Sequence, residues 1–225
     1  MRRITNYSWH TGKLTKPVRL LVVSDLHNGP YADIIPHLKD VDALLMPGDL
    51  AERHGQMYQR GIGFLREAVD RLPTFVGVGN HEMRLKSYPE FADLVERTGA
   101  TLLFNSYTRF GELAIGCWYR PERCGQPDML EAFQAEAGCR ILMSHRPEDY
   151  FRSLRDKDVD LVLSGHAHGG QWRVFGRGVF APGQGLFPRY TRGIVGNMII
   201  SAGAGGNAPA PRINNPKEIL RIELD

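Results

Sequence analysis

The feature that most constrains this chain is a repeated pattern, in which a short apolar run of the kind found in buried strands ends in a polar residue that can bind a metal. The runs lie at residues 18–24, 41–46, 73–78, 139–143 and 160–163. Strands that are covered on both faces read as continuous apolar runs, and they occur mainly in parallel sheets. Ligands of such sheets gather at the carboxyl ends of the strands. We therefore expect the polar residues to meet at one edge of a sheet.

The residues that follow these runs are aspartate, asparagine and histidine, with no cysteine among them. They are Asp25, His27, Asp49, Asn80, His81, His145, His166 and His168. Mixed oxygen and imidazole donors suit manganese, iron or zinc better than they suit a thiolate-rich structural zinc site. The set is larger than one ion needs, and two ions about 3.5 to 4 Å apart are a usual arrangement for hydrolysing phosphate esters.

Helices are predicted between the strands, and this alternation indicates an α/β fold. Segment 57–72 has apolar residues at helical spacing, with charged residues between them. Further helices are predicted at 32–39, 88–98 and 126–136. Further strands are predicted at 2–9 (at a sheet edge), 100–104, 110–118, 197–201 and 218–224, with 100–104 and 110–118 forming a hairpin or part of a second sheet.

Composition narrows the classes of protein that the chain can belong to. With 225 residues, 42% hydrophobic and 24% charged, it is expected to form a single domain over 1–225. The net charge of +3 is scattered, which gives little support to a long nucleic-acid substrate. No apolar stretch reaches the roughly 18 residues of a membrane-spanning helix. Cys117, Cys124 and Cys139 form no pattern typical of a disulfide framework, so we interpret them as reduced thiols.

The first residues, Met1-Arg2-Arg3, are not followed by the apolar region that an export signal needs. We therefore expect a cytoplasmic protein with no transmembrane segment. Its oligomeric state is left open.

Several short motifs together resemble a known superfamily. Asp25-x-His27, Gly48-Asp49, Gly79-Asn80-His81-Glu82, Ser144-His145 and Gly165-His166-x-His168 are similar, in this order, to the blocks of the calcineurin-like metallophosphoesterases. Each block alone is weak evidence, but all of them in order over residues 18–170 are specific. Segments 169–171, 182–188 and 212–216 resemble the bacterial branch of phosphohydrolases related to YkuE and YaeI. The resemblance implies a four-layer αββα sandwich of two mixed sheets, whereas the pattern of strands and helices indicates only α/β.

The resemblance also implies a reaction and a cofactor. It implies a phosphodiester or phosphomonoester substrate, with the diester favoured, hydrolysed by in-line attack of a metal-bridging hydroxide. Two divalent or trivalent ions, of manganese, iron or zinc, are implied. Asp25, His27 and His168 would hold the first, Asn80, His145 and His166 the second, and Asp49 would bridge them. His81 would face the phosphate as a cationic donor without binding a metal.

Residues beside the motifs have two interpretations each. Arg146, Arg53 and Arg84 are candidates for binding phosphate, because a guanidinium group holds it in a forked geometry, or they form structural ion pairs. Glu82 either orients the ring of His81 or is an ordinary surface carboxylate. The loop 180–190 and Arg192 form a wall of the substrate cleft, or they pack in the core. His10, His37 and His54 are expected to be surface or packing residues.

Two alternative functions share the same fold. A non-catalytic scaffold would be expected to lack some ligands or His81, yet all of them are present. A nuclease of the superfamily would use the same metals, but it would need a basic groove and added domains. We therefore expect a small phosphate ester as partner, with no obligate nucleic acid.

Overall fold

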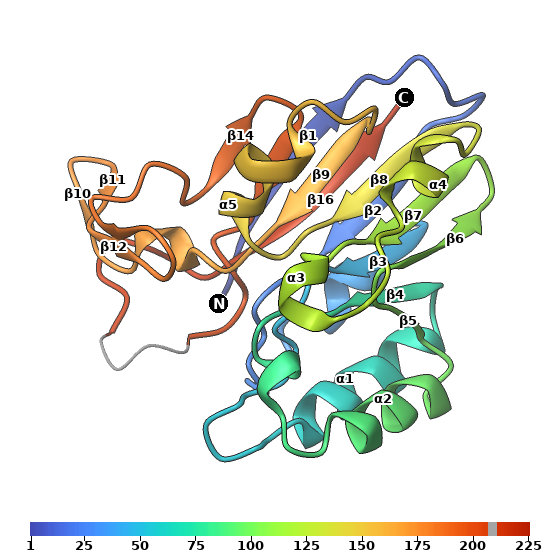
Figure 1. Ribbon diagram of the computed structural model, residues 1–225. Helices are drawn as coiled ribbons and strands as arrows, with labels where there is room; N and C mark the ends of the chain where they lie inside the picture. The colour runs from blue at the N-terminus through green and yellow to red at the C-terminus, as the bar shows by residue number, and fades with distance from the viewer. Residues whose placement is uncertain (207–210) are drawn as a thin grey trace.

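Two six-stranded sheets form the centre of the protein in this computed structural model, which describes residues 1–206 and 211–225 (Figure 1). The first sheet has the order β1 (Arg3–Trp9), β16 (Glu218–Leu224), β2 (Val18–Val22), β3 (Ala43–Met46), β4 (Thr74–Gly77) and β5 (Thr101–Leu103). The second has the order β14 (Gly193–Val195), β15 (Met198–Ile200), β9 (Leu161–Ser164), β8 (Cys139–Met143), β7 (Leu113–Cys117) and β6 (Ser106–Phe110).

Parallel pairing dominates the middle of both sheets. Strands β2 to β5 pair in parallel in one sheet, and β7, β8, β9 and β15 do so in the other. Antiparallel pairs join β16 to β2, β6 to β7 and β14 to β15. Both sheets are therefore mixed, and the edge position expected for the strand at 2–9 is confirmed.

The apolar runs are continuous because both faces of each central strand are covered. In β2, Leu20 and Val22 face the second sheet, whereas Leu21 packs on the other side with the helical layer. In β8, Ile141 likewise lies between the sheets and Leu142 lies beneath the outer helices. Successive side chains of a strand point to opposite faces, so a strand buried on both sides needs an apolar residue at every position.

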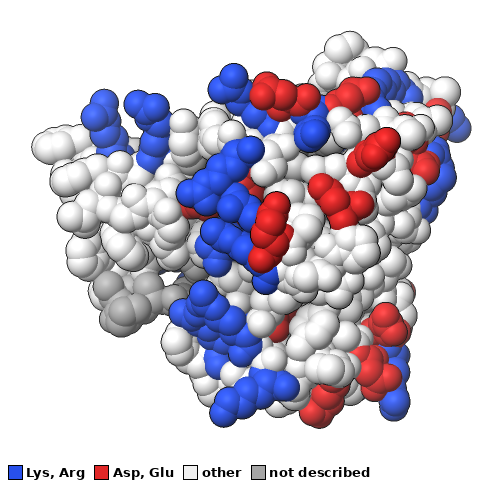
Figure 2. Space-filling model, in the orientation of Figure 1, with Lys and Arg blue, Asp and Glu red and all other residues white. Residues whose placement is uncertain are grey.

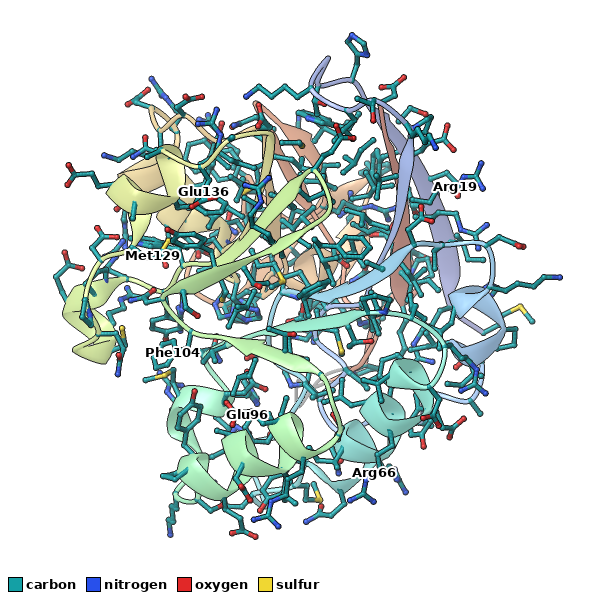
Figure 3. The ribbon with its side chains drawn as sticks, turned by 90° about the vertical axis from the view of Figure 1, so that its right-hand side faces the viewer. Arg19, Arg66, Glu96, Phe104, Met129 and Glu136 are labelled. Carbon is teal, nitrogen blue, oxygen red and sulfur yellow. The ribbon has the colours of Figure 1, made fainter. Side chains whose placement is uncertain are left out.

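Helices cover the outside of each sheet. Helices α1 (Gln59–Val69) and α2 (Tyr88–Arg97) bury Phe64 and Phe91 against the first sheet. Helix α4 (Leu130–Gln134), α5 (Pro147–Asp149) and the π-helical turn η3 (Tyr150–Leu154) cover the second. Figure 3 shows the layers from the side, with Arg66 and Glu96 outside one sheet and Met129 and Glu136 toward the other side. The four-layer sandwich expected from the resemblance is confirmed.

Some predicted elements differ from those observed. The helix predicted at 126–136 begins only at Leu130, since Pro127 disfavours a helical residue before it and the Asp128 carboxylate accepts the Leu130 N–H at 3.0 Å. A short helix that was not predicted, α3 (Pro121–Cys124), precedes it. At 32–39 only a 3-10 turn, η1 (Ile35–Leu38), forms. Segments 100–104 and 110–118 belong to different sheets, so they do not form a hairpin together.

Smaller elements complete the chain. Two short hairpins, β10 (Arg173–Val174) with β11 (Arg177–Gly178) and β12 (Phe180–Ala181) with β13 (Gly185–Leu186), project at the left of Figure 1. Turns η2 (Glu82–Arg84) and η4 (His168–Gly170) follow β4 and β9. No helix in the described part of the chain is both long and apolar enough to cross a bilayer.

Candidate metal centre

All the predicted site residues meet at one place, where strands of both sheets end. Loops after β2, β3 and β4 carry the residues from the first sheet, and loops after β8 and β9 carry those from the second. The residues are Asp25, His27, Asp49, Asn80, His81, His145, His166 and His168, and none is more than 7% exposed. Buried charges and imidazoles in this number need partners, because burial of an unpaired ionisable group is costly.

The loops hold several of these residues in an unusual backbone conformation. The backbone angle φ is positive at Asp25 (55°), His27 (50°), Asp49 (55°), His166 (66°) and His168 (46°). Positive φ is uncommon outside glycine and costs on the order of 1 kcal/mol or more for each residue. The Asp25 N–H donates to Gly48 O at 3.1 Å and the His27 N–H to Asp49 O at 2.9 Å. These hydrogen bonds help to fix the strained loops against each other.

Two glycines of the motifs allow the loops to approach closely. A Cβ atom at Gly165 would lie 1.9 Å from Ser24 Oγ and 2.2 Å from Asp25 Oδ2. At Gly79 it would lie 2.3 Å from Asp49 Oδ1. All three distances are far below van der Waals contact, so any other residue at either position would displace a carboxylate.

One group of donors consists of Asp25, His27 and His168. The His27 and His168 Nε2 atoms are 3.2 Å apart, and Asp25 Oδ1 lies 3.5 Å from the His168 Nε2 and 3.8 Å from the His27 Nε2. Two nitrogens that bind one ion at about 2.1 Å are about 3.0 to 3.4 Å apart at tetrahedral or octahedral angles. The spacing of the two imidazole nitrogens therefore fits a shared metal ion, and the Asp25 carboxylate lies close to both.

A second group consists of Asp49, His145 and His166. The His145 Nδ1 lies 3.0 Å from Pro47 O and donates its proton there, which turns Nε2 toward Asp49 Oδ2, also 3.0 Å away. Burial opposes protonation of the ring, but the charge of Asp49 outweighs burial and raises the pKa of His145 to about 9. A positive charge is thus stabilised between the His145 ring and the Asp49 carboxylate. A bound metal ion would provide this charge in place of the proton.

An unsatisfied atom supports the same interpretation. Asn80 Oδ1 is buried and makes no hydrogen bond to any residue within 1–206 or 211–225. Buried polar atoms are nearly always paired, so such atoms require an explanation. An amide oxygen can bind a metal, and Asp49 of the second group also lies near the first group, with its Oδ2 3.9 Å from the His27 Nε2. The residues present fit two ions that share Asp49.

The ring of His81 lies beside this centre, with its Nε2 3.9 Å from Asp49 Oδ2 and its Nδ1 3.4 Å from Glu52 Oε1. Burial lowers the pKa of His81 to about 4, although the charge of Asp49 opposes the change. The Arg53 N–H donates to the His81 Nδ1 at 3.2 Å. The role of His81 as a donor to the phosphate stays a prediction.

Glu82 has neither of the roles expected from the sequence. Its side chain is fully buried and accepts the N–H groups of Asp49, Ala51 and Gly79 at 2.9, 2.8 and 2.8 Å. Burial, followed by the charge of Asp49, raises the pKa of Glu82 to about 7, against the effect of the backbone donors. Glu82 is therefore a structural residue that joins the loops after β3 and β4.

An open cavity of about 370 Å³ leads to the centre. Among its lining residues are Asp49, Asn80, His81, His166 and His168, together with Arg53, Arg84 and Arg146. Arg146 Nη1 is 3.4 Å from the His166 Nε2. The three guanidinium groups suit an anionic substrate.

The loop 180–190 contributes only in part to this cavity. Phe180, Pro182 and Gly183 line it, whereas Phe187, Arg189 and Arg192 line a different cavity. The sequence interpretation of the whole loop as a wall of the cleft is therefore only partly right.

Two residues near the centre were not identified from the sequence. His54 is exposed, as expected, but it also lines the cavity, with its ring centroid 6.2 Å from that of His81. Arg212 Nη2 lies 3.1 Å from the His168 Nδ1 and donates to Gly205 O. Arg212 lies in a segment that resembles the bacterial branch, but its distance along the chain gave no sign of this contact.

Replacing Glu82 tests its structural role. Glu82→Ala leaves three buried N–H groups without an acceptor, each costing about 1 to 3 kcal/mol, so we expect a loss of about 3 kcal/mol or more in the free energy of unfolding. Denaturant unfolding measures this loss, and metal analysis should show weaker binding because Asp49 is displaced. The control is Glu90→Ala on the exposed face of α2, which should change the stability by less than about 0.5 kcal/mol. Equal stability of the two variants would contradict the role.

Comparisons with known proteins agree with this geometry. A family profile described as calcineurin-like phosphoesterase matches residues 18–170. An uncharacterized metallophosphoesterase of Helicobacter pylori is 28% identical over 227 residues, which cover 94% of this chain and 61% of that protein. The phosphodiesterase YaeI of Escherichia coli is 27% identical over 238 residues, which cover 92% of this chain and 82% of YaeI.

A solved structure shows the same fold. The sulfate thiohydrolase SoxB of Thermus thermophilus superposes with a TM-score of 0.52 at 15% identity, over 83% of this chain and 52% of SoxB. The chain spans about 61% of the length of the Helicobacter relative. Because the family profile covers most of the sequence and contains every strand-end motif, this chain belongs to the calcineurin-like phosphoesterase family.

Proposed function

We propose that the chain is a dinuclear metal-dependent phosphoesterase that hydrolyses a phosphodiester. The observation that carries the proposal is that two donor groups, one of Asp25, His27 and His168 and one of Asp49, His145 and His166, lie at the end of a cavity with three arginines. Membership of the family supports a metal-binding phosphoesterase, and the name of YaeI supports the diester. We also propose that residues 1–225 act as one domain, since the sheets share one apolar core.

The residues that would hold the ions follow from the two groups. Asp25, His27 and His168 would hold one ion, Asn80, His145 and His166 the other, and Asp49 would contact both. Manganese, iron and zinc match these donors. When bound, two such ions polarise the phosphoryl group and provide the nucleophile for in-line attack.

The remaining polar residues would act on the substrate directly. His81 lines the cavity, and its ring would donate a proton to a phosphoryl oxygen or to the leaving oxygen. Arg146 and Arg53 would bind the non-bridging oxygens, because a guanidinium group offers several donors in one plane. The charge of these arginines also attracts an anionic ester into the cavity.

Asp49→Ala tests the shared carboxylate. Removing it takes a ligand from both ions, so we expect metal content and hydrolysis both to fall to the level of the metal-free chain. Elemental analysis and the rate on bis(p-nitrophenyl) phosphate measure the two effects. The matched control is Asp156→Ala, an exposed carboxylate distant from the donor groups, which should keep both. Normal turnover by Asp49→Ala would contradict the assignment.

His81→Ala separates catalysis from metal binding. Loss of a positioned proton donor should lower kcat by about a hundredfold or more, with the metal content unchanged. His10→Ala, an exposed histidine, is the control and should behave as the wild type. A parallel loss of metal in His81→Ala would instead make this residue a ligand.

Substrate preference is tested with the metal-stripped chain reloaded with manganese. We expect bis(p-nitrophenyl) phosphate to be hydrolysed faster than p-nitrophenyl phosphate, and both rates to depend on the metal. A faster monoester reaction would make the enzyme a phosphatase. No reaction with either ester, together with fewer than two metals per chain, would favour the non-catalytic scaffold.

A further inference from the structure

A second and larger cavity lies on the hairpin lobe, outside the site described above. Its volume is about 570 Å³, and its lining includes four arginines, Arg173, Arg177, Arg189 and Arg192, with Thr191 beside them. We call it the arginine cavity. None of these residues lines the cavity of the metal centre.

The segment that forms the hairpins carries positive charge and no acidic residue of its own. The sequence has no aspartate or glutamate between Asp160 and Glu218. In Figure 2 the lobe on the left, which carries β10 to β12 in Figure 1, shows basic side chains and no acidic ones in this view. Glu218 contacts Arg192 at 3.1 Å, but it also accepts hydrogen bonds from Ala202 N and Thr5 Oγ1.

The other arginines of the cavity lack a carboxylate partner. The side chains of Arg177 and Arg189 are exposed, and they make no ion pair and no hydrogen bond to residues in the described ranges. Burial, and then the charge of Arg192, lower the pKa of Arg173. Like charges gathered around one cavity repel each other, and an anion placed among them would relieve the repulsion.

One of the four guanidinium groups is already held in place. Arg173 Nη1 donates to Gly169 O at 2.7 Å and to Thr191 Oγ1 at 3.3 Å, and its Nη2 donates to Gly176 O. A fixed guanidinium group loses less conformational entropy when it binds a ligand. The wall of the cavity is therefore partly preorganised.

We propose that the arginine cavity is a binding site for a phosphate group, separate from the metal centre. Phosphate carries up to two charges on several oxygens, so it can accept forked hydrogen bonds from more than one arginine. A single carboxylate would satisfy fewer of the donors. The volume exceeds that of a phosphate ion, so the group is part of a larger ligand or binds with water.

Two kinds of ligand could provide the phosphate group. One is a soluble phosphate compound. The other is the headgroup of an anionic phospholipid, because Val174, Phe175 and Leu186 of the same hairpins are exposed apolar residues. Apolar side chains flanked by basic ones suit the surface of an anionic bilayer.

The first arm of the test uses inorganic phosphate and the full metal-loaded chain. Calorimetric titration of the wild type with inorganic phosphate should show a binding site in addition to the metal centre. In Arg177→Gln/Arg189→Gln this additional binding should weaken about tenfold or more, because charge-assisted hydrogen bonds are lost. The control is Arg66→Gln/Arg97→Gln, which removes the same charge from exposed positions on α1 and α2 and should bind as the wild type. This result supports the site with a soluble source.

The second arm uses sedimentation with vesicles of phosphatidylcholine, with and without phosphatidylglycerol. In the other outcome, free phosphate binds at the metal centre alone, while the wild type and the control pair bind the anionic vesicles and the Arg177/Arg189 variant does not. This result supports a lipid headgroup as the ligand. If the Arg177/Arg189 variant matches the wild type in both arms, or the control pair loses as much, the proposal is overturned. Hydrolysis of the nitrophenyl esters should be equal in all three proteins. If the second phosphate site is disproved, the proposed phosphoesterase function is therefore not affected.

Discussion

The carboxylate of Asp25 joins the two sheets at the point on which the site depends. It belongs to the loop after β2, yet it accepts the His166 N–H at 3.0 and 3.1 Å from the loop after β9. Gly165 allows this approach, since a side chain there would overlap Asp25 and Ser24. The same carboxylate lies in one donor group with residues from both sheets. The donor groups can therefore assemble only when the two sheets pack against each other.

The negative charge of the buried carboxylates explains why the assembled site favours bound cations. Carboxylates and imidazoles are buried together, and the charge of Asp49 is strong enough to raise the pKa of His145 against the effect of burial. Protons on the imidazole rings can neutralise part of the carboxylate charge, but they leave Asn80 Oδ1 without a partner among the described residues. Metal ions would satisfy carboxylate, imidazole and amide donors together. The strained backbone at these positions keeps the donors directed inward.

The sequence predicted the parts of the fold that depend on burial. Continuous apolar runs located the central strands, and the residues that follow them form the site, because parallel strands end at a common edge. The role of Glu82 was not predictable, since it depends on N–H groups from two loops that the sequence does not show to be adjacent. The hairpins β10 to β13 were missed because strands of two residues have no periodicity.

Strand β16 has a consequence for how the chain folds. It lies between β1 and β2, and within the described residues β1 pairs with no other strand. Residues 218–224 must therefore be in place before the amino-terminal strand has a partner and before β2, which leads into Asp25, is enclosed on both sides. Contacts between such distant segments are slow to form, because loop closure must precede them. Assembly of the donor groups is thus expected to be a late step, completed by the last strand of the chain rather than by the segments that carry the ligands.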